Sequence, residues 1–426
     1  IVPPLWAFGP WRWRDEVKNK PAYFEDSPVT SPYNSQLTED ILMMEAFDIP
    51  CTAYWIDRQR GIGPHAFDDY VIDSTRLPNM PQMISWLSRK NIKLMLWIGP
   101  FVMGQMAEEA KEKGYGLITR EIKDQHTLVD FTNPEACSWW AEKGLKKLAK
   151  MGVRGFKLDR ADGETELDSL HFKTFVGTSY RENYNDFPRQ YVKAAYDAVK
   201  PILGEDFVLF PRAQYTGSSR YGAMWAGDTK CDADGLRSAV VALLRCSVMG
   251  YPIHGSDIGG YWGKDVFQRE TGKRWLAFGC FSPIMEVGPT HNKGFWGLQD
   301  EPRFDSTLMA TWRLYAKTRL KLMPYIYGLA KESRKTGMPI ARPLFLTWPE
   351  QKESWECWQT YTLGPDILVS PVWEMGKVTE KVYLPKGETW IDCWNEDKVY
   401  DGGQFVDVDV SAQYKIPLFI RKGSSI

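Results

Sequence analysis

Residues 134–159 read PEACSWWAEKGLKKLAKMGVRGFKLD, and the fold prediction depends on the unit they contain. Asn133 is a capping residue and Pro134 suits a first helical turn, so the pattern over Pro134–Met151 predicts a helix. The short apolar run Gly155–Leu158 that follows predicts a buried strand. A helix that leads directly into a buried strand is the repeating unit of α/β proteins with parallel sheets.

The same alternation recurs along the first three-quarters of the chain. Eight apolar runs predict strands, at Leu5–Phe8, Thr52–Ile56, Lys93–Ile98, Gly155–Leu158, Phe207–Phe210, Ala223–Ala226, Tyr251–His254 and Ser282–Val287. Helical patterns lie between them at Pro81–Lys90, Pro134–Met151, Arg189–Val199, Leu236–Met249, Asp265–Phe278 and Ser306–Leu329. Eight repeats over roughly 330 residues predict an α/β fold of the (β/α)8 TIM-barrel type. A doubly wound open sheet is the alternative, but no G-x-G-x-x-G motif follows a first strand.

The pattern changes near Gly337-Met338-Pro339. Beyond that point, short alternating runs are separated by turn residues, at Thr360–Leu363, Ile367–Val372, Lys381–Leu384, Thr389–Cys393, Gln404–Val410 and Tyr414–Ile420. Such spacing predicts a small antiparallel β domain. We therefore expect a (β/α)8 catalytic barrel over residues 1–335 and an antiparallel β domain over residues 336–426.

Composition excludes several classes of protein. The 426 residues are 43% hydrophobic and 25% charged, which is typical of a soluble globular protein. A net charge of -1 argues against nucleic acid as a partner. There is no apolar run of about 18 residues to span a membrane, and the first residues show no signal peptide. Seven scattered cysteines and five histidines show no metal-ligand spacing, so neither a disulfide framework nor a metal site is expected.

In a barrel, the chemistry occupies the carboxyl ends of the strands. Four of the predicted strands are followed closely by an aspartate, namely Asp57, Asp159, Asp228 and Asp257. One such aspartate is more often a helix cap than a catalytic residue. Four of them, together with a lysine, an arginine and two tryptophans, predict one acidic pocket with aromatic walls and no His or Cys. Such a pocket suits a pair of carboxylates that act on a sugar.

Three segments resemble glycoside hydrolase family 31: Gly155-Phe-Lys-Leu-Asp159, Arg212–Asp228 (RAQYTGSSRYGAMWAGD) and Gly255–Tyr261 (GSDIGGY). Supporting matches follow in family order, at Leu5–Gly9, Trp97–Pro100, Asp130–Pro134, Arg274–Gly279 and Leu322–Tyr325. The resemblance covers essentially the whole chain. It implies a retaining α-glycosidase of the group that contains α-glucosidases, α-xylosidases and α-galactosidases.

The resemblance also implies roles for individual residues. Asp159 matches the nucleophile, and Asp228 matches the general acid/base. Six further residues match positions that line the subsite of the departing sugar: Asp57, Trp97, Lys157, Arg212, Trp225 and Asp257. Strand alternation places Lys157 on the same inward face as Asp159, where a cation lowers the pKa of a carboxyl group. An ordinary ion pair inside the barrel is the other interpretation of Lys157.

The sequence departs from the family pattern after the nucleophile, where the family has D-x-x-E. Either Asp162 replaces that glutamate or an insertion has displaced Glu164, and Arg160 adds a cation beside the site. The chain also opens at the first barrel strand, so the family's N-terminal β-sandwich is absent from it.

A further departure concerns the family's Arg-x-His segment, which here is Glu286-Val287-Gly288. His291 is the candidate substitute for the missing histidine. Arg160 and Glu286 are new polar groups for a sugar hydroxyl, so we expect a sugar other than α-glucose. An α-galacto-configured substrate is the first to test.

These observations predict a retaining exo-α-glycosidase that acts by double displacement, with no metal and no organic cofactor. Its partner is a small carbohydrate, and neither its oligomeric state nor its compartment can be read from the chain. One alternative is an α-transglycosylase that uses the same carboxylates. The other is a non-catalytic carbohydrate-binding barrel, against which the presence of both Asp159 and Asp228 argues.

Overall fold

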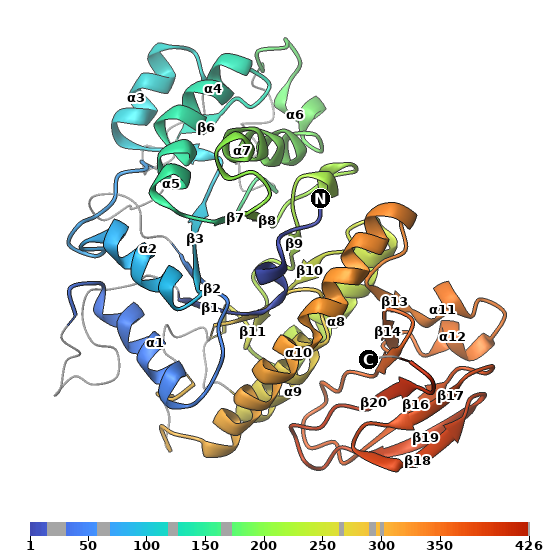
Figure 1. Cartoon of the computed structure of the whole chain (residues 1–426). Helices are drawn as coiled ribbons and strands as arrows, with labels where there is room; N and C mark the ends of the chain where they lie inside the picture. The colour runs from blue at the N-terminus through green and yellow to red at the C-terminus, as the bar shows by residue number, and fades with distance from the viewer. Residues whose placement is uncertain are drawn as a thin grey trace.

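The computed structural model describes residues 1–14, 31–57, 69–117, 127–162, 173–263, 268–288, 295–298 and 302–424. Figure 1 shows parallel strands in the middle of the larger part, helices around them, and a smaller β domain beside the long helix. The predicted (β/α)8 barrel and antiparallel β domain are both confirmed.

The barrel strands are β1 (Pro10–Arg14), β2 (Ala53–Ile56), β3 (Lys93–Ile98), β7 (Gly155–Leu158), β8 (Val208–Pro211), β9 (Met224–Trp225), β10 (His254–Gly255), β11 (Asp257–Ile258) and β12 (Met285–Val287). Seven of them pair in the order β11-β12-β1-β2-β3-β7-β8, and β9 pairs with β10. The backbone N–H of Ala223 donates to the carbonyl of Leu209 and joins β9 to β8. Since β10 and β11 are one stretch interrupted at Ser256, the strands fill eight positions.

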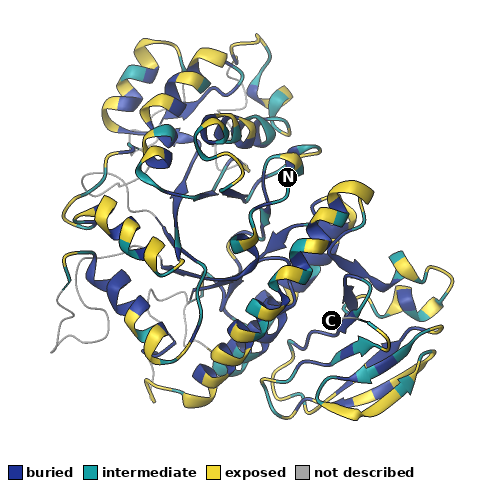
Figure 2. Ribbon diagram, in the orientation of Figure 1, coloured by how far each residue is buried: buried dark blue, intermediate teal, exposed yellow. Residues whose placement is uncertain are grey.

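The helices of the barrel lie outside these strands, with buried inner and exposed outer faces (Figure 2). The main ones are α1 (Ser35–Ala46), α2 (Met80–Arg89), α3 (Gly104–Glu112), α4 (Pro134–Lys143), α5 (Leu145–Met151), α7 (Phe187–Leu203), α8 (Ala233–Val248), α9 (Arg269–Cys280) and α10 (Ser306–Thr336). The side chain of Asn133 caps α4, as its sequence predicts. Within the described ranges, no helix is long and apolar enough to cross a bilayer.

Shorter elements complete the barrel: the helical turns η1 (Leu5–Phe8), α6 (Tyr180–Asn183) and η3 (Ser218–Arg220), and the strands β4 (Phe101–Val102), β5 (Gly116–Leu117) and β6 (Thr127–Val129). The strand predicted at Leu5–Phe8 is therefore wrong, because η1 is a 3-10 turn that begins after Pro4. The first barrel strand is β1, which alternates tryptophans with Arg12 and Arg14. Because the arginines interrupt it, β1 lacks the continuous apolar run that a buried parallel strand normally shows.

The two arginines of β1 are completely buried because α1 supplies their counter-charge. Arg14 makes two hydrogen bonds to the carboxylate of Asp40, of 2.9 and 2.6 Å. Arg12 lies 3.1 Å from the same carboxylate, and Tyr54 donates to it at 2.7 Å. Burial raises the pKa of Asp40, but the two guanidinium groups outweigh burial and lower it. One carboxylate therefore holds the first strand and the first helix together.

The C-terminal domain contains β13 (Ala341–Pro343), β14 (Tyr361–Leu363), β15 (Ile367–Val369), β16 (Thr379–Leu384), β17 (Thr389–Asp392), β18 (Asn395–Asp401), β19 (Gln404–Asp409) and β20 (Leu418–Arg421), with α11 (Leu344–Thr347) and α12 (Lys352–Glu356). Six strands form an antiparallel sheet in the order β13-β14-β15-β20-β17-β18, and β16 pairs with β19. We propose that the domain boundary lies at residues 335–336, where α10 ends.

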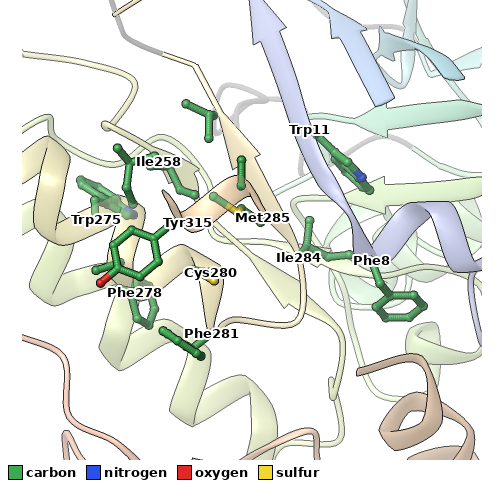
Figure 3. Packing of buried hydrophobic residues seen from close by; sticks show 14 of the residues in the cluster. Phe8, Trp11, Ile258, Trp275, Phe278, Cys280, Phe281, Ile284, Met285 and Tyr315 are labelled. Atoms are coloured by element: carbon green, nitrogen blue, oxygen red, sulfur yellow. The ribbon is translucent and has the colours of Figure 1, made fainter. Parts of the chain in front are cut away.

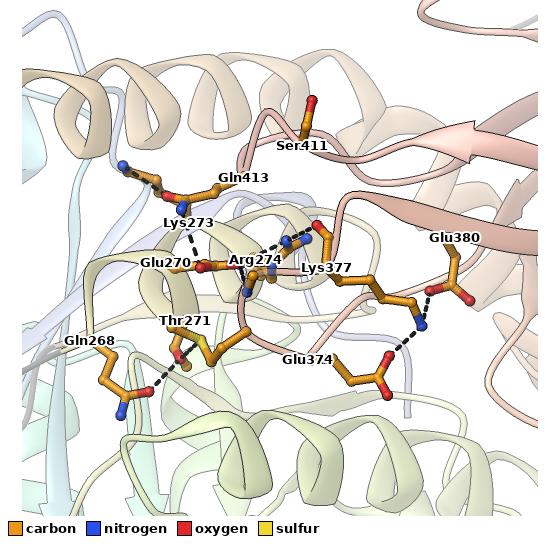
Figure 4. Close-up of polar contacts among 12 residues, drawn as sticks. Gln268, Glu270, Thr271, Lys273, Arg274, Glu374, Lys377, Glu380, Ser411 and Gln413 are labelled. Carbon is orange, nitrogen blue, oxygen red and sulfur yellow. Dashed lines mark hydrogen bonds and ion pairs between the residues drawn. The ribbon is translucent and has the colours of Figure 1, made fainter.

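The barrel and the β domain share one hydrophobic core. Buried residues of β13, β14 and β15 belong to the same cluster as the residues of α9, α10 and β12, part of which Figure 3 shows. Tyr361 donates a hydrogen bond to the carbonyl of Phe281 at 2.9 Å. Polar contacts extend this interface (Figure 4), since Gln413 donates to Glu270 at 3.1 Å and Arg274 to the carbonyl of Lys377 at 3.0 Å.

We predict that Asp40→Ala lowers the free energy of unfolding by about 3–5 kcal/mol, because it leaves two buried guanidinium groups without their carboxylate. Urea denaturation followed by circular dichroism measures the change. The matched control is Asp197→Ala, which removes the exposed partner of Lys193 and costs at most about 1 kcal/mol. Equal losses in the two variants would contradict the prediction.

Candidate active site

The predicted site residues gather at the carboxyl ends of the barrel strands. Asp57, Asp159 and Arg212 each follow the last residue of a strand, namely β2, β7 and β8. The others lie in or just after a strand: Trp97 in β3, Lys157 in β7, Trp225 in β9, Asp228 after β9 and Asp257 in β11. The structure therefore brings segments that are distant in sequence to one end of the barrel, as the barrel prediction requires.

Three donors fix the carboxylate of Asp159. The indole of Trp97 donates to Oδ2 at 2.9 Å, and the backbone N–H of Arg160 donates to Oδ1 at 2.7 Å. The guanidinium of Arg212 lies 2.8 Å from Oδ1. Hydrogen bonds of this kind hold the carboxylate in one orientation.

The expectation that Lys157 is the cation beside Asp159 is wrong, because the ammonium of Lys157 bonds to Asp257 at 3.0 Å. The strand alternation on which it rested ends at Leu158. Arg160 and Ala161, with φ of 65° and 70°, both adopt the left-handed region. Two consecutive non-glycine residues in that region are costly, and such strain clusters at functional sites. The side-chain cation that contacts Asp159 is Arg212.

Arg212 connects three carboxylates. It donates twice to Asp162, with both distances 2.8 Å, and its Nη1 lies 2.8 Å from Asp159 and 3.9 Å from Asp228 Oδ2. Of the two acidic residues that are candidates for the family's glutamate, Asp162 thus reaches the site. Glu164 lies outside the described residues, so the choice between them stays a prediction.

Asp228 lies at the open side of this cluster, and 39% of its side chain is exposed. Since one Arg212 nitrogen contacts both carboxylates, the oxygens of Asp159 and Asp228 are no farther apart than the sum of its two distances. Partial burial and the negative charges of Asp159 and Asp257 raise the pKa of Asp228 to about 6. Asp228 therefore keeps its proton at a pH where an ordinary aspartate has lost it.

A second charged group lies deeper in the barrel, around Lys157. Its ammonium is 3.9 Å from the ring centroid of Trp55 and 3.5 Å from that of Trp225. Burial lowers the pKa of Lys157, but the carboxylates of Asp257, Glu286 and Asp57 outweigh burial and raise it. Among the residues that the structure describes, no three His, Cys, Asp or Glu side chains are grouped as a metal site.

Glu286 also belongs to this deeper group. Sequence analysis names Glu286 but does not predict that it lies with Lys157. Its side chain is 0% exposed, and the indole of Trp55 donates to its Oε2 at 2.8 Å. Burial raises the pKa of Glu286 well above its usual range. The negative charge of nearby Asp257 adds to this rise of the pKa. The expectation that Glu286 offers a new contact to a sugar is therefore wrong.

Gly288 stands where sequence analysis places the family's histidine, and the structure leaves no room there for a side chain. A Cβ on Gly288 would lie 2.1 Å from Cε2 of Trp13. The ring of Trp13 stacks on that of Trp55, with centroids 4.7 Å apart. Sequence analysis does not identify Trp13 as a residue near the site, because it predicts the first strand at Leu5–Phe8 rather than at β1. His291, the candidate substitute, lies outside the described residues.

A parallel (β/α)8 barrel with opposed carboxylates at the carboxyl ends of its strands is an architecture of glycoside hydrolases. Residues 1–329 match the model of the glycosyl hydrolases family 31 TIM-barrel domain. Residues 337–426 match that of the glycosyl hydrolase family 31 C-terminal domain. The chain therefore belongs to glycosyl hydrolase family 31, a family of hydrolases.

Named relatives agree with this assignment. The chain is 27% identical to the α-xylosidase of Saccharolobus solfataricus, over 99% of this chain and 55% of the relative. It is 29% identical to the sulfoquinovosidase of Escherichia coli, over 86% of this chain and 55% of the relative. It also resembles the crystal structure of a GH31 α-xylosidase from a soil metagenome complexed with xylose. That match has a TM-score of 0.85 and 27% identity, and it covers 100% of this chain and 64% of the other. The chain thus spans about half the length of the curated relatives it matches.

We predict that Gly288→Ala destabilises the protein by about 1–3 kcal/mol, because the new methyl group overlaps the ring of Trp13. Thermal unfolding measures the loss, and the shift of Trp13 also changes the near-ultraviolet circular dichroism. The matched control is Gly328→Ala in α10, where nothing lies within 4 Å of the new Cβ. This helix substitution stabilises by about 0.5–1 kcal/mol. A neutral Gly288→Ala would show that Trp13 does not fill this space.

Proposed function

We propose that the protein is a retaining exo-α-glycosidase, with Asp159 as nucleophile and Asp228 as general acid/base. The observation that carries the proposal is that one nitrogen of Arg212 lies within 4 Å of both carboxylates. Retaining enzymes hold their carboxyls about 5–5.5 Å apart, whereas inverting enzymes leave about 6.5–9.5 Å for a water. The upper limit that Arg212 sets on the oxygen separation admits the shorter spacing and excludes all but the lower end of the longer one.

In the first step, Asp159 Oδ attacks the anomeric carbon while the glycosidic C–O bond breaks and Asp228 gives its proton to the departing oxygen. In the second step, Asp228 takes a proton from water, whose oxygen displaces Asp159. Two inversions return the α configuration. The donors on Asp159 hold its carboxylate in one orientation for attack, and the raised pKa of Asp228 favours the protonated acid.

The substrate class is an α-linked glycoside. The names of relatives support it, since they include α-xylosidases, sulfoquinovosidases and a probable glucan 1,3-α-glucosidase. An isomaltosyltransferase, 26% identical to this chain, supports transglycosylation as the second candidate function. The preference for α-galacto substrates rests only on Arg160, because Glu286 is buried. A screen of α-glucoside, α-xyloside, α-galactoside and α-N-acetylgalactosaminide substrates decides among the sugars.

We predict that Asp159→Ala and Asp228→Ala each remove nearly all turnover while the fold persists. With an activated α-glycoside, azide restores product formation in both variants. It attacks opposite the leaving group in Asp159→Ala and gives the β-glycosyl azide. In Asp228→Ala it displaces Asp159 and gives the α-glycosyl azide. Nuclear magnetic resonance of the products distinguishes them, and activity like that of the wild type in either variant would remove that residue from the mechanism.

The pH profile is a further prediction. The acid must carry its proton, so kcat/KM for a disaccharide falls as the pH rises through about 6, the pKa of Asp228. An α-glycosyl fluoride is the control, because fluoride departs with little help from an acid. Its kcat/KM keeps its value beyond pH 6. A disaccharide profile that stays flat to pH 8 would contradict the assignment of Asp228.

A further inference from the structure

Trp262 is an exposed aromatic residue that the proposed mechanism does not use. It follows the Gly255–Tyr261 segment and is 50% exposed, whereas Trp97 and Trp225 in the site are buried. Its indole Nε1 donates to the backbone carbonyl of Asp228 at 3.2 Å. A large apolar ring that stays in water beside the proposed acid/base is a candidate surface for a ligand.

The backbone holds Trp262 in this place. The N–H of Trp262 donates to the carbonyl of Thr229 at 3.1 Å, and its own carbonyl accepts from Cys231 at 3.0 Å. The ammonium of Lys230 lies 5.6 Å from the centroid of the ring. Four contacts thus join Trp262 to residues 228–231, and the ring is fixed before any ligand arrives. A fixed aromatic surface binds without a large loss of side-chain entropy.

Its position relative to the two carboxylates indicates which part of a substrate it meets. Asp159 attacks the anomeric carbon from one face, and its described partners are Trp97, Arg212 and the backbone of Arg160. Asp228 gives its proton to the glycosidic oxygen, which belongs to the leaving group. Because Trp262 bonds to the backbone of Asp228, we place it on the leaving-group side of the site. The apolar C–H face of a sugar ring matches a flat indole.

We propose that Trp262 is the platform on which the leaving sugar, and then an acceptor sugar, stacks beside Asp228. This inference rests on the proposed function and names a residue that sets its aglycone specificity. In transfer, an acceptor hydroxyl oxygen bonds to the anomeric carbon, the bond from that carbon to Asp159 breaks, and the hydroxyl proton goes to Asp228. Trp262 raises the local concentration of sugar acceptors over water, so it sets the ratio of transfer to hydrolysis.

The test compares Trp262→Ala and Trp262→Phe with the wild type on an α-glycosyl fluoride and an α-linked disaccharide of the same glycone. Trp262→Ala lowers kcat/KM for the disaccharide about tenfold, the size expected for one lost ring contact. It leaves the fluoride within about twofold, because fluoride has no ring to stack. Trp262→Phe keeps the ring without the N–H and retains most of the disaccharide activity. Added acceptor sugar gives less transfer product in Trp262→Ala than in the wild type.

Trp355→Ala is the matched control, since that tryptophan is 58% exposed but stacks on Phe345 in the β domain. It leaves both substrates unchanged. Equal losses on fluoride and disaccharide in Trp262→Ala would assign Trp262 to the positioning of Asp228 and overturn the platform. Unchanged disaccharide kinetics and an unchanged transfer ratio would overturn it as well. A wild type that is inactive on every α-glycosyl fluoride would instead defeat the proposed function, so the two failures are distinguishable.

Discussion

The buried ammonium of Lys157 is the constraint on which the interior of this barrel depends. An ion without a partner in such a place costs several kcal/mol, so neighbouring strands must supply compensation. Asp257 supplies a carboxylate at 3.0 Å, and Trp55 and Trp225 supply the faces of their rings. Glu286 then accepts a hydrogen bond from the indole of Trp55 and fixes that ring. The residues at the ends of β2, β9, β11 and β12 therefore depend on one another, because together they compensate one buried charge.

The two cations of the site interact with different carboxylates. Lys157 pairs with Asp257 and lies in the field of Glu286 within the barrel. Arg212 pairs with Asp159 and Asp162 beyond the strand ends. Asp228 lies farther from Arg212, with its Oδ2 3.9 Å from the Nη1 that is 2.8 Å from Asp159. The two neighbouring aspartates therefore differ in environment. Asp159 is held by close donors, whereas Asp228 has a pKa of about 6.

Sequence patterns predict the barrel well where strands are continuous apolar runs, as in β3 and β7. They fail at β1, whose arginines are neutralised by Asp40 on a helix that lies beyond it in sequence. They also miss β18, an edge strand whose residues are almost all exposed and show no alternation. Within the site, each of the eight predicted residues lies in a barrel strand or just after one. Their pairing was not predictable, because the left-handed turn after Asp159 ends the strand alternation.

The loop that carries Asp228 depends on the loop that carries Trp262. Gly260 has φ of 78°, and a Cβ on it would lie 2.4 Å from the Cα of Cys231, so only glycine allows the two loops to pack this closely. The Asp228 side of the site is therefore one unit built from the ends of β9 and β11. The same two strands also carry Trp225 and Asp257, whose side chains contact the ammonium of Lys157. The loop of Asp228 and the buried ammonium are therefore anchored by the same pair of strand ends.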